Sequence, residues 1–140
     1  MKAELVYLDS SALVKLVVRE AASDALRVWV AAHPAAVTSA LAVTEVRRAI
    51  SRLSPRRGLS DRARLVLDGV ALLAVDQDVL ERAARLAPKE LRSLDAIHIA
   101  SALSLGADLL AFVTYDDRQR DAARKARLSV IQPGALRPTT

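Results

Sequence analysis

The sequence predicts an α/β protein with a short parallel sheet of four to five strands, flanked on both faces by helices. Short apolar segments such as LVYL and LLAFV alternate along the chain with longer amphipathic segments. This order is typical of a parallel sheet covered by helices. At 140 residues and 52% hydrophobic content, the chain suits one domain with a sizeable core. We expect that domain at residues 1–133, followed by a polar C-terminal tail at residues 134–140.

Apolar segments bounded by turn-forming residues predict the strands. The clearest is residues 109–113, since all five are apolar and Gly106 ends the preceding helical pattern. The predicted strands are residues 5–8, 37–38, 72–75, 109–113 and 129–131.

Helical periodicity and end residues predict the helices between these strands. Pro34 and Pro88 end two of them, and Ser93 is expected to cap another. A turn is expected at residues 54–58, where serine, proline and glycine follow the third helix. The predicted helices are residues 10–18, 22–32, 40–53, 60–69, 78–86, 94–105 and 116–126.

The composition excludes several classes of protein. No cysteine is present, so a disulfide framework and a thiolate zinc site are excluded, and any metal must be bound by oxygen or by the two histidines. No apolar stretch approaches the roughly 20 residues of a membrane helix, and the N-terminal residues lack a signal-peptide pattern. We therefore expect no membrane interaction and a cytoplasmic location.

The charge balance favours an anionic partner. Lys and Arg number 21 against 16 acidic residues, a net charge of +5. Arginines concentrate at residues 47–64 and a second basic group lies at residues 118–127. Arginine can pair with phosphate groups, although solvated helix faces would explain the same pattern.

Four acidic residues stand in apolar surroundings: Asp9, Glu45, Asp95 and Asp116. A buried carboxylate is costly unless something neutralises it, and four such costs suggest a shared cation. Asp9 and Asp116 each follow a predicted strand, where parallel sheets bind ligands. Glu45 and Asp95 lie on helix faces predicted to point inward. Together they predict a divalent-metal site, of the kind that supports hydrolysis.

Each of these acids has a simpler interpretation when taken alone. Asp9 and Asp116 can cap the helices that follow them, and Asp95 can interact with a helix N-terminal dipole. The joint arrangement of the four acids favours the metal site over separate roles at helix ends.

Two helical residues have alternatives of their own. Glu45 can pair with Arg48 or Arg52 on the same helix, and alone this ordinary pair is the preferred interpretation. His98, three residues after Asp95, is expected to be a hydrogen-bonded core histidine rather than a metal ligand.

The segments that hold the four acids occur in a recognisable order: YLDSSALVKL, VTEVRRAI, LRSLDAIHIASAL and FVTYDDRQRDAARKA. In this order they resemble a PIN-domain ribonuclease of the VapC toxin type, over residues 5–133. The most specific parts are DSSALVK and LDAIHIASA followed by TYD.

This resemblance implies a PIN-like three-layer α/β/α fold and a divalent-metal-dependent endoribonuclease that hydrolyses RNA phosphodiester bonds. The catalytic residues that it implies are Asp9, Glu45, Asp95 and Asp116. Of these, Asp9, Asp95 and Asp116 would bind Mg²⁺, with Mn²⁺ as the alternative ion.

Further site residues follow from the same resemblance. Thr114 corresponds to the hydroxyl residue near the fourth acid, and Ser10 and Ser11 are weaker candidates to line the site. Family spacing favours Asp116 over the adjacent Asp117, which is expected beside the site or exposed at the start of the helix. Arg92 can contact substrate phosphate or can pair with Glu90.

The resemblance also implies a cognate VapB-type antitoxin, with assembly as a homodimer or as a toxin–antitoxin hetero-oligomer. Two alternatives remain open. One is a PIN-domain RNA-processing nuclease without an antitoxin, and the other is a non-catalytic RNA-binding module. The four acids count against the latter, because a binder of phosphates gains nothing from converging negative charges.

Overall fold

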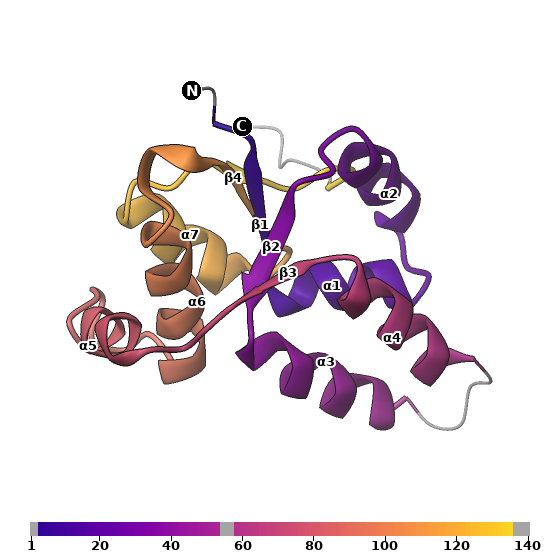
Figure 1. Cartoon of the computed structure of the whole chain (residues 1–140), viewed down its shortest axis with the longest axis horizontal. Coiled ribbons are helices and arrows are strands. Elements are labelled where there is room, and N and C mark those ends of the chain that lie inside the picture. Colours follow the sequence, from indigo (N-terminus) through magenta and orange to yellow (C-terminus); the bar gives the residue numbers. More distant parts are fainter. Residues whose placement is uncertain (1–2, 54–57, 136–140) are drawn as a thin grey trace.

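The computed structural model describes residues 3–53 and 58–135 and has a five-stranded sheet between two layers of helices (Figure 1). All paired strands are parallel, which confirms the predicted fold class. The spatial order is β3-β2-β1-β4-β5. The strands are β1 (Leu5–Leu8), β2 (Ala36–Ser39), β3 (Ala71–Leu73), β4 (Leu109–Val113) and β5 (Val130–Ile131).

The helices follow the strands in the predicted alternation. They are α1 (Ser10–Val17), α2 (Ser23–Ala31), α3 (Leu41–Ser51), α4 (Leu59–Asp68), α5 (Gln77–Ala84), α6 (Ser93–Leu103) and α7 (Asp117–Lys125), with a short 3-10 helix at Gly106–Asp108. The predicted turn at residues 54–58, apart from Gly58, and the predicted tail beyond residue 135 lie outside the described residues.

Side chains of β1 divide the interior into two cores. Val6 and Leu8 point to a core shared with α1, α2, α3 and α4, whereas Tyr7 points to the opposite core under α6 and α7. This alternation is the two-residue period of a strand buried on both faces. Figure 1 accordingly places α6 and α7 on one side of the strands and α1, α2 and α4 on the other.

Most element ends differ from the predictions by one or two residues, among them those of β3, α6 and α7. The third strand occupies residues 71–73 rather than 72–75. Ser93 is the first residue of α6 rather than its N-cap. The N-cap is Arg92, which has an extended backbone, and its side chain makes no capping hydrogen bond. The last helix begins at Asp117, with Asp116 as its N-cap.

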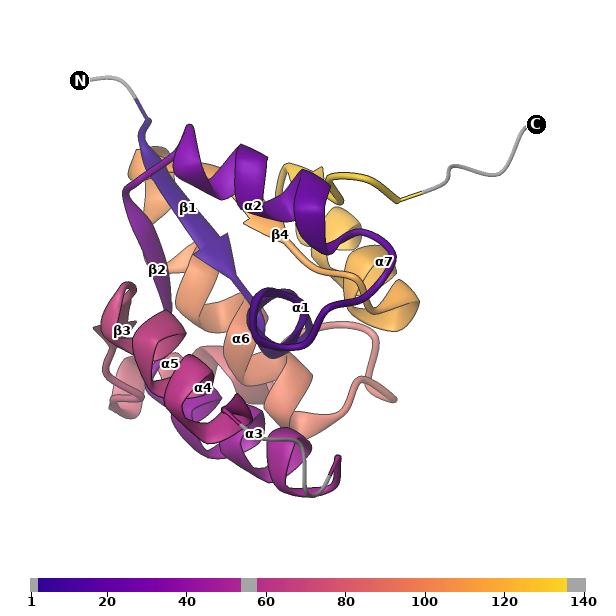
Figure 2. The same cartoon turned by 90° about the vertical axis from the view of Figure 1, so that its right-hand side faces the viewer.

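The carboxyl ends of β1, β2 and β4 lie at one edge of the sheet because these strands are parallel neighbours. Each of them leads directly into residues that begin a helix or a polar loop, as the run from β1 into α1 shows (Figure 2). In the described part of the chain, no helix has the length and apolar content needed to cross a bilayer.

The core makes a prediction about stability. Leu13 is fully buried and Leu65 is 73% exposed. Leu13→Ala should lower the free energy of unfolding by about 2–5 kcal/mol, since it leaves a cavity. Leu65→Ala should change it by less than about 0.5 kcal/mol. Urea denaturation of the two variants measures the difference, and equal losses would contradict this assignment of the core.

Candidate active site

Asp9 follows β1 directly and is only 4% exposed. It caps α1, because its Oδ1 accepts hydrogen bonds from the Ala12 backbone N–H at 3.1 Å and from the Ser11 hydroxyl at 2.6 Å. Burial raises the pKa of the Asp9 carboxyl against the opposing effects of nearby His98 and of these hydrogen bonds. The helix-capping and metal-site interpretations are therefore compatible at this residue.

A hydroxyl pair connects the start of α1 with the end of β4. Ser11 Oγ gives its single hydrogen to Asp9 and accepts the backbone N–H of Tyr115 at 2.9 Å. Thr114 Oγ1 lies 3.3 Å from Ser11 Oγ and accepts the Asp116 N–H at 3.2 Å. Because the hydrogen of Ser11 is committed, Thr114 is the donor in the hydroxyl pair. Ser11 thus fixes Asp9 relative to the loop that carries Asp116.

The two adjacent acids after β4 have different surroundings. Asp116 caps α7, with Oδ1 accepting the N–H groups of Arg118 at 2.8 Å and Gln119 at 3.1 Å. The Asp117 side chain is 81% exposed and pairs with Arg120 at 3.0 Å. Of the two, Asp116 is therefore the one near the other acids.

Asp95 lies in the first turn of α6 and is half-buried. Burial and then the negative charge of Asp116 raise the pKa of the Asp95 carboxyl, and Asp9 and Glu45 add to this against the opposing effect of His98. Four carboxylates from α1, α3, α6 and α7 or their caps consequently share one electrostatic field. Such a field attracts a cation.

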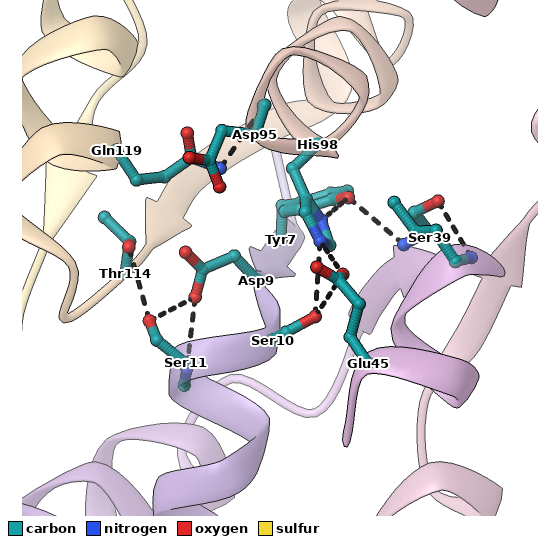
Figure 3. Close-up of polar contacts among 12 residues, drawn as sticks. Tyr7, Asp9, Ser10, Ser11, Ser39, Glu45, Asp95, His98, Thr114 and Gln119 are labelled. Atoms are coloured by element: carbon teal, nitrogen blue, oxygen red, sulfur yellow. Dashed lines mark hydrogen bonds and ion pairs between the residues drawn. The ribbon is translucent and has the colours of Figure 1, made fainter. Parts of the chain in front are cut away.

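Glu45 does not pair with Arg48 or Arg52, so the interpretation preferred for this residue alone is wrong. Its Oε1 lies 2.5 Å from His98 Nε2 and accepts the hydroxyl hydrogen of Ser10 at 2.6 Å (Figure 3). Burial alone would raise the pKa of the Glu45 carboxyl. The hydrogen bond from His98, the positive charge of the His98 ring and the hydrogen bond from Ser10 outweigh burial, so the pKa is lowered.

His98 is a hydrogen-bonded core histidine, as expected, yet it also contacts an acid of the site. Figure 3 separates two polar groups. Asp9 and Asp95 lie with Thr114 and Gln119 on one side, whereas Glu45 and Ser10 lie beside the His98 ring.

Three of the four carboxylates share a property that bears on metal binding. Asp9, Glu45 and Asp116 each commit one oxygen to protein donors, and their other oxygen has no hydrogen bond among the described residues. Free carboxylate oxygens are the ligands that Mg²⁺ prefers. Within residues 3–53 and 58–135, however, no group of three or more His, Asp or Glu side chains is already arranged to hold a metal ion. The donor chemistry fits a divalent cation, and the side chains would have to move closer to bind it.

A pocket of about 310 Å³ adjoins Asp95. Arg92, Arg118 and Lys125 line it, together with Glu90. Arg92 is exposed, and the ion pairs of the described residues do not include one between Arg92 and Glu90. The alternative pairing considered for Arg92 is thus not formed.

Ser11, a weaker candidate from the sequence, holds Asp9 and the loop before Asp116 through its hydrogen bonds. One residue near the acids was not identified from the sequence. Gln119 is fully buried, donates from Nε2 to the Asp95 carbonyl at 3.3 Å, and has no partner for Oε1 among the described residues. Its position three residues before Ala122, on the buried face of α7, is the pattern that could have revealed it.

Comparison with known proteins identifies the family. The PIN domain family matches residues 6–125. The chain belongs to the PIN-domain family. It is 50% identical over 128 residues to Ribonuclease VapC46 of Mycobacterium tuberculosis, covering 91% of this chain and 97% of that one. It is 39% identical over 137 residues to Ribonuclease VapC47 of the same species, covering 95% and 100%. The resemblance to VapC-type PIN proteins is thereby confirmed.

Solved toxin structures agree with this chain in fold. VapC20 of Mycobacterium tuberculosis, described as a Sarcin-Ricin loop cleaving toxin, superposes with a TM-score of 0.67 at 21% identity, covering 84% of this chain and 94% of that one. VapBC2 of Rickettsia felis, solved with a DNA fragment from its promoter, gives a TM-score of 0.70 at 11% identity, covering 92% and 98%. At these identities the likeness concerns the fold alone.

The electrostatics of the site predict how Asp95 affects stability. Its raised pKa means that the folded state binds the proton more tightly than the unfolded state. Stability must therefore fall as pH rises from the ordinary aspartate value of about 4 through the raised folded value. Without metal, Asp95→Asn should raise the unfolding midpoint at pH 8, and this gain should vanish near pH 3.

The exposed Asp117 provides the matched control for that measurement. Asp117→Asn should give no gain at either pH, because its charge is solvated. Thermal unfolding across pH in the presence of a chelator tests both variants. A gain for Asp95→Asn that persisted at pH 3 would contradict the role of charge repulsion.

Proposed function

We propose that this PIN-domain protein is the toxin ribonuclease of a type II toxin–antitoxin system and hydrolyses RNA phosphodiester bonds with Mg²⁺ or Mn²⁺. The observation that carries the proposal is the convergence of Asp9, Glu45, Asp95 and Asp116 from different elements, three of them with an uncommitted oxygen. The names of the related VapC ribonucleases support the same reaction.

The residues present would divide the work of hydrolysis between them. Asp9, Asp95 and Asp116 would hold the cation, which when bound lowers the pKa of water and stabilises the departing oxygen. Ser11 and Thr114 keep the Asp9 carboxylate in place through hydrogen bonds. Ser10 orients Glu45 at the border of the same site. No histidine or lysine has to take part as a general base.

Substrate binding would use the basic residues beside Asp95. Arg92 and Arg118 reach the pocket that Asp95 also lines, so a backbone phosphate there would lie next to the acids. Arginine suits this role because its planar guanidinium can donate two hydrogen bonds to one phosphate. In the basic group at residues 47–64, Arg48 and Arg52 line a separate groove with Glu45, and Arg56 and Arg57 lie outside the described residues.

An antitoxin and a second toxin copy belong to the proposal. The solved structures of similar fold include a toxin–antitoxin complex from Klebsiella pneumoniae. On this chain Val28 of α2 and Leu65 of α4 are each 73% exposed. Apolar side chains so placed suit contacts with another chain, either a VapB-type antitoxin or a second protomer.

Cleavage of cellular RNA tests the proposed reaction. Purified protein should cut RNA at discrete positions with Mg²⁺ or Mn²⁺ and not after chelation, leaving 5′-phosphate and 3′-hydroxyl ends. Asp9→Asn should reduce cleavage to background while keeping the helix cap, since asparagine also accepts at Oδ1. Asp78→Asn, an exposed acid in the first turn of α5, should retain the wild-type rate.

The results of this experiment separate the alternatives. Cleavage that survives in Asp9→Asn would refute the assigned site. Folded protein that binds RNA but never cuts it, with either ion, would favour a non-catalytic RNA-binding module.

Arg92 makes a separate prediction about substrate binding. Arg92→Ala should raise the KM for a defined RNA on the order of 10-fold with little change in kcat, as for the loss of one charged hydrogen bond. Arg27→Ala is the control, because Arg27 pairs with Asp24 on α2 at the opposite side of the sheet (Figure 1). An unchanged KM for Arg92→Ala in steady-state kinetics would remove this residue from the substrate site.

A further inference from the structure

His98 is buried in the middle of α6, yet both of its ring nitrogens contact polar side chains from other elements. It is 2% exposed. Nδ1 lies 2.7 Å from the hydroxyl of Tyr7 on β1, and Nε2 lies 2.5 Å from Glu45 Oε1 on α3 and 3.2 Å from Ser10 Oγ on α1. One imidazole therefore joins four elements at the edge of the acidic site (Figure 3).

The direction of the bond to Glu45 follows from the groups involved. A carboxylate can only accept, so the hydrogen between the two residues belongs to His98 Nε2. Ser10 gives its own hydroxyl hydrogen to the same Oε1 at 2.6 Å. One carboxylate oxygen thus receives two donors, and Oε2 has no hydrogen bond among the described residues.

The other end of the imidazole is anchored as firmly. The Tyr7 hydroxyl oxygen accepts the backbone N–H of Ser39 at 3.1 Å. The Tyr7 ring stacks on Phe112, with centroids 5.2 Å apart and planes 6° from parallel, and both residues are fully buried. Tyr7 is therefore a rigid support that fixes the rotation of the His98 ring.

Glu45 has other cationic partners within its surroundings. A groove of about 760 Å³ is lined by Glu45, Arg48 and Arg52, together with Ser10. An unrestrained glutamate on a helix flank commonly pairs with a basic residue three or four residues away, and Arg48 lies three residues after Glu45. In the structure the carboxylate is instead turned inward to His98 and Ser10.

We infer that His98 is a positioning residue, which locks Glu45 Oε1 onto the fold and keeps Glu45 from the arginines of the groove. Glu45 then acts in the site through Oε2 alone. This inference rests on the proposed ribonuclease function and adds a residue that acts through Glu45 rather than on the substrate.

A double-mutant cycle tests the inference. His98→Leu should lower kcat for a defined RNA by about 10- to 100-fold, the usual effect of losing a group that orients a site residue, with KM within a few-fold of wild type. His98→Gln, whose amide can still donate to Glu45, should recover most of that loss. Adding His98→Leu to Glu45→Gln should cause no further decrease, because the carboxylate that His98 positions is already lost.

Three outcomes would overturn the inference. They are an unchanged kcat in His98→Leu, a loss in His98→Gln as large as in His98→Leu, and multiplying effects of His98→Leu and Glu45→Gln. Because metal-dependent cleavage by the wild type and its loss in Asp9→Asn are measured alongside, a failure of this inference is distinguishable from a failure of the proposed function.

A measurement without activity guards against variants that do not fold. The imidazole ¹H–¹⁵N spectrum of metal-free wild-type protein should contain an exchange-protected Nε2–H with a strongly downfield proton. The proton should move upfield in Glu45→Gln and stay in place in Asp78→Asn. Absence of this resonance in the wild type would overturn the contact on which the inference depends.

Discussion

The rest of the site depends on one constraint, the burial of the Asp9 carboxylate at the end of the central strand. β1 pairs with β2 on one side and β4 on the other, so its last residues have no route to solvent except at the carboxyl edge. A charge placed there needs donors, and Ser11 and the Ala12 N–H supply them. The same bonds start α1, so the helix and the charge are fixed by one set of contacts. These bonds do not cancel the negative charge of Asp9, which contributes to the raised pKa of the Asp95 carboxyl.

The central strand also determines how the polar groups divide. Tyr7 and Asp9 are two residues apart in an extended chain, so both belong to the same face of the sheet. Tyr7 is deeper and meets His98, whereas Asp9 lies at the edge beneath Asp95. Burial raises the pKa of the Tyr7 phenol strongly, so that it stays protonated as a hydrogen-bonding group. The strand thus supplies a structural polar residue and a charged one from consecutive positions on one face.

Local sequence was sufficient for the features that depend on neighbours along the chain. Asp9 and Asp116 were predicted at strand ends because each closely follows an apolar segment. The predicted ends of β3 were wrong because this edge strand is partly exposed, with Leu72 at 47%. Its apolar residues therefore do not separate the strand from the flanking loop. The contact between Glu45 and His98 spans 53 residues and depends on how α3 and α6 meet, which no spacing along the chain encodes.

Helix α6 connects the two polar groups through its own geometry. Asp95 and His98 are three residues apart, close to one turn, so they project from neighbouring positions on one flank. Asp95 reaches the group around Asp9, and His98 reaches Glu45 and Tyr7. Ala102 packs against the sheet residues Tyr7 and Phe112, and Ala96 and Ala100 of the same helix are also buried. A shift of α6 would therefore move Asp95 relative to Asp9 and would at the same time disturb the contact of His98 with Glu45 on α3.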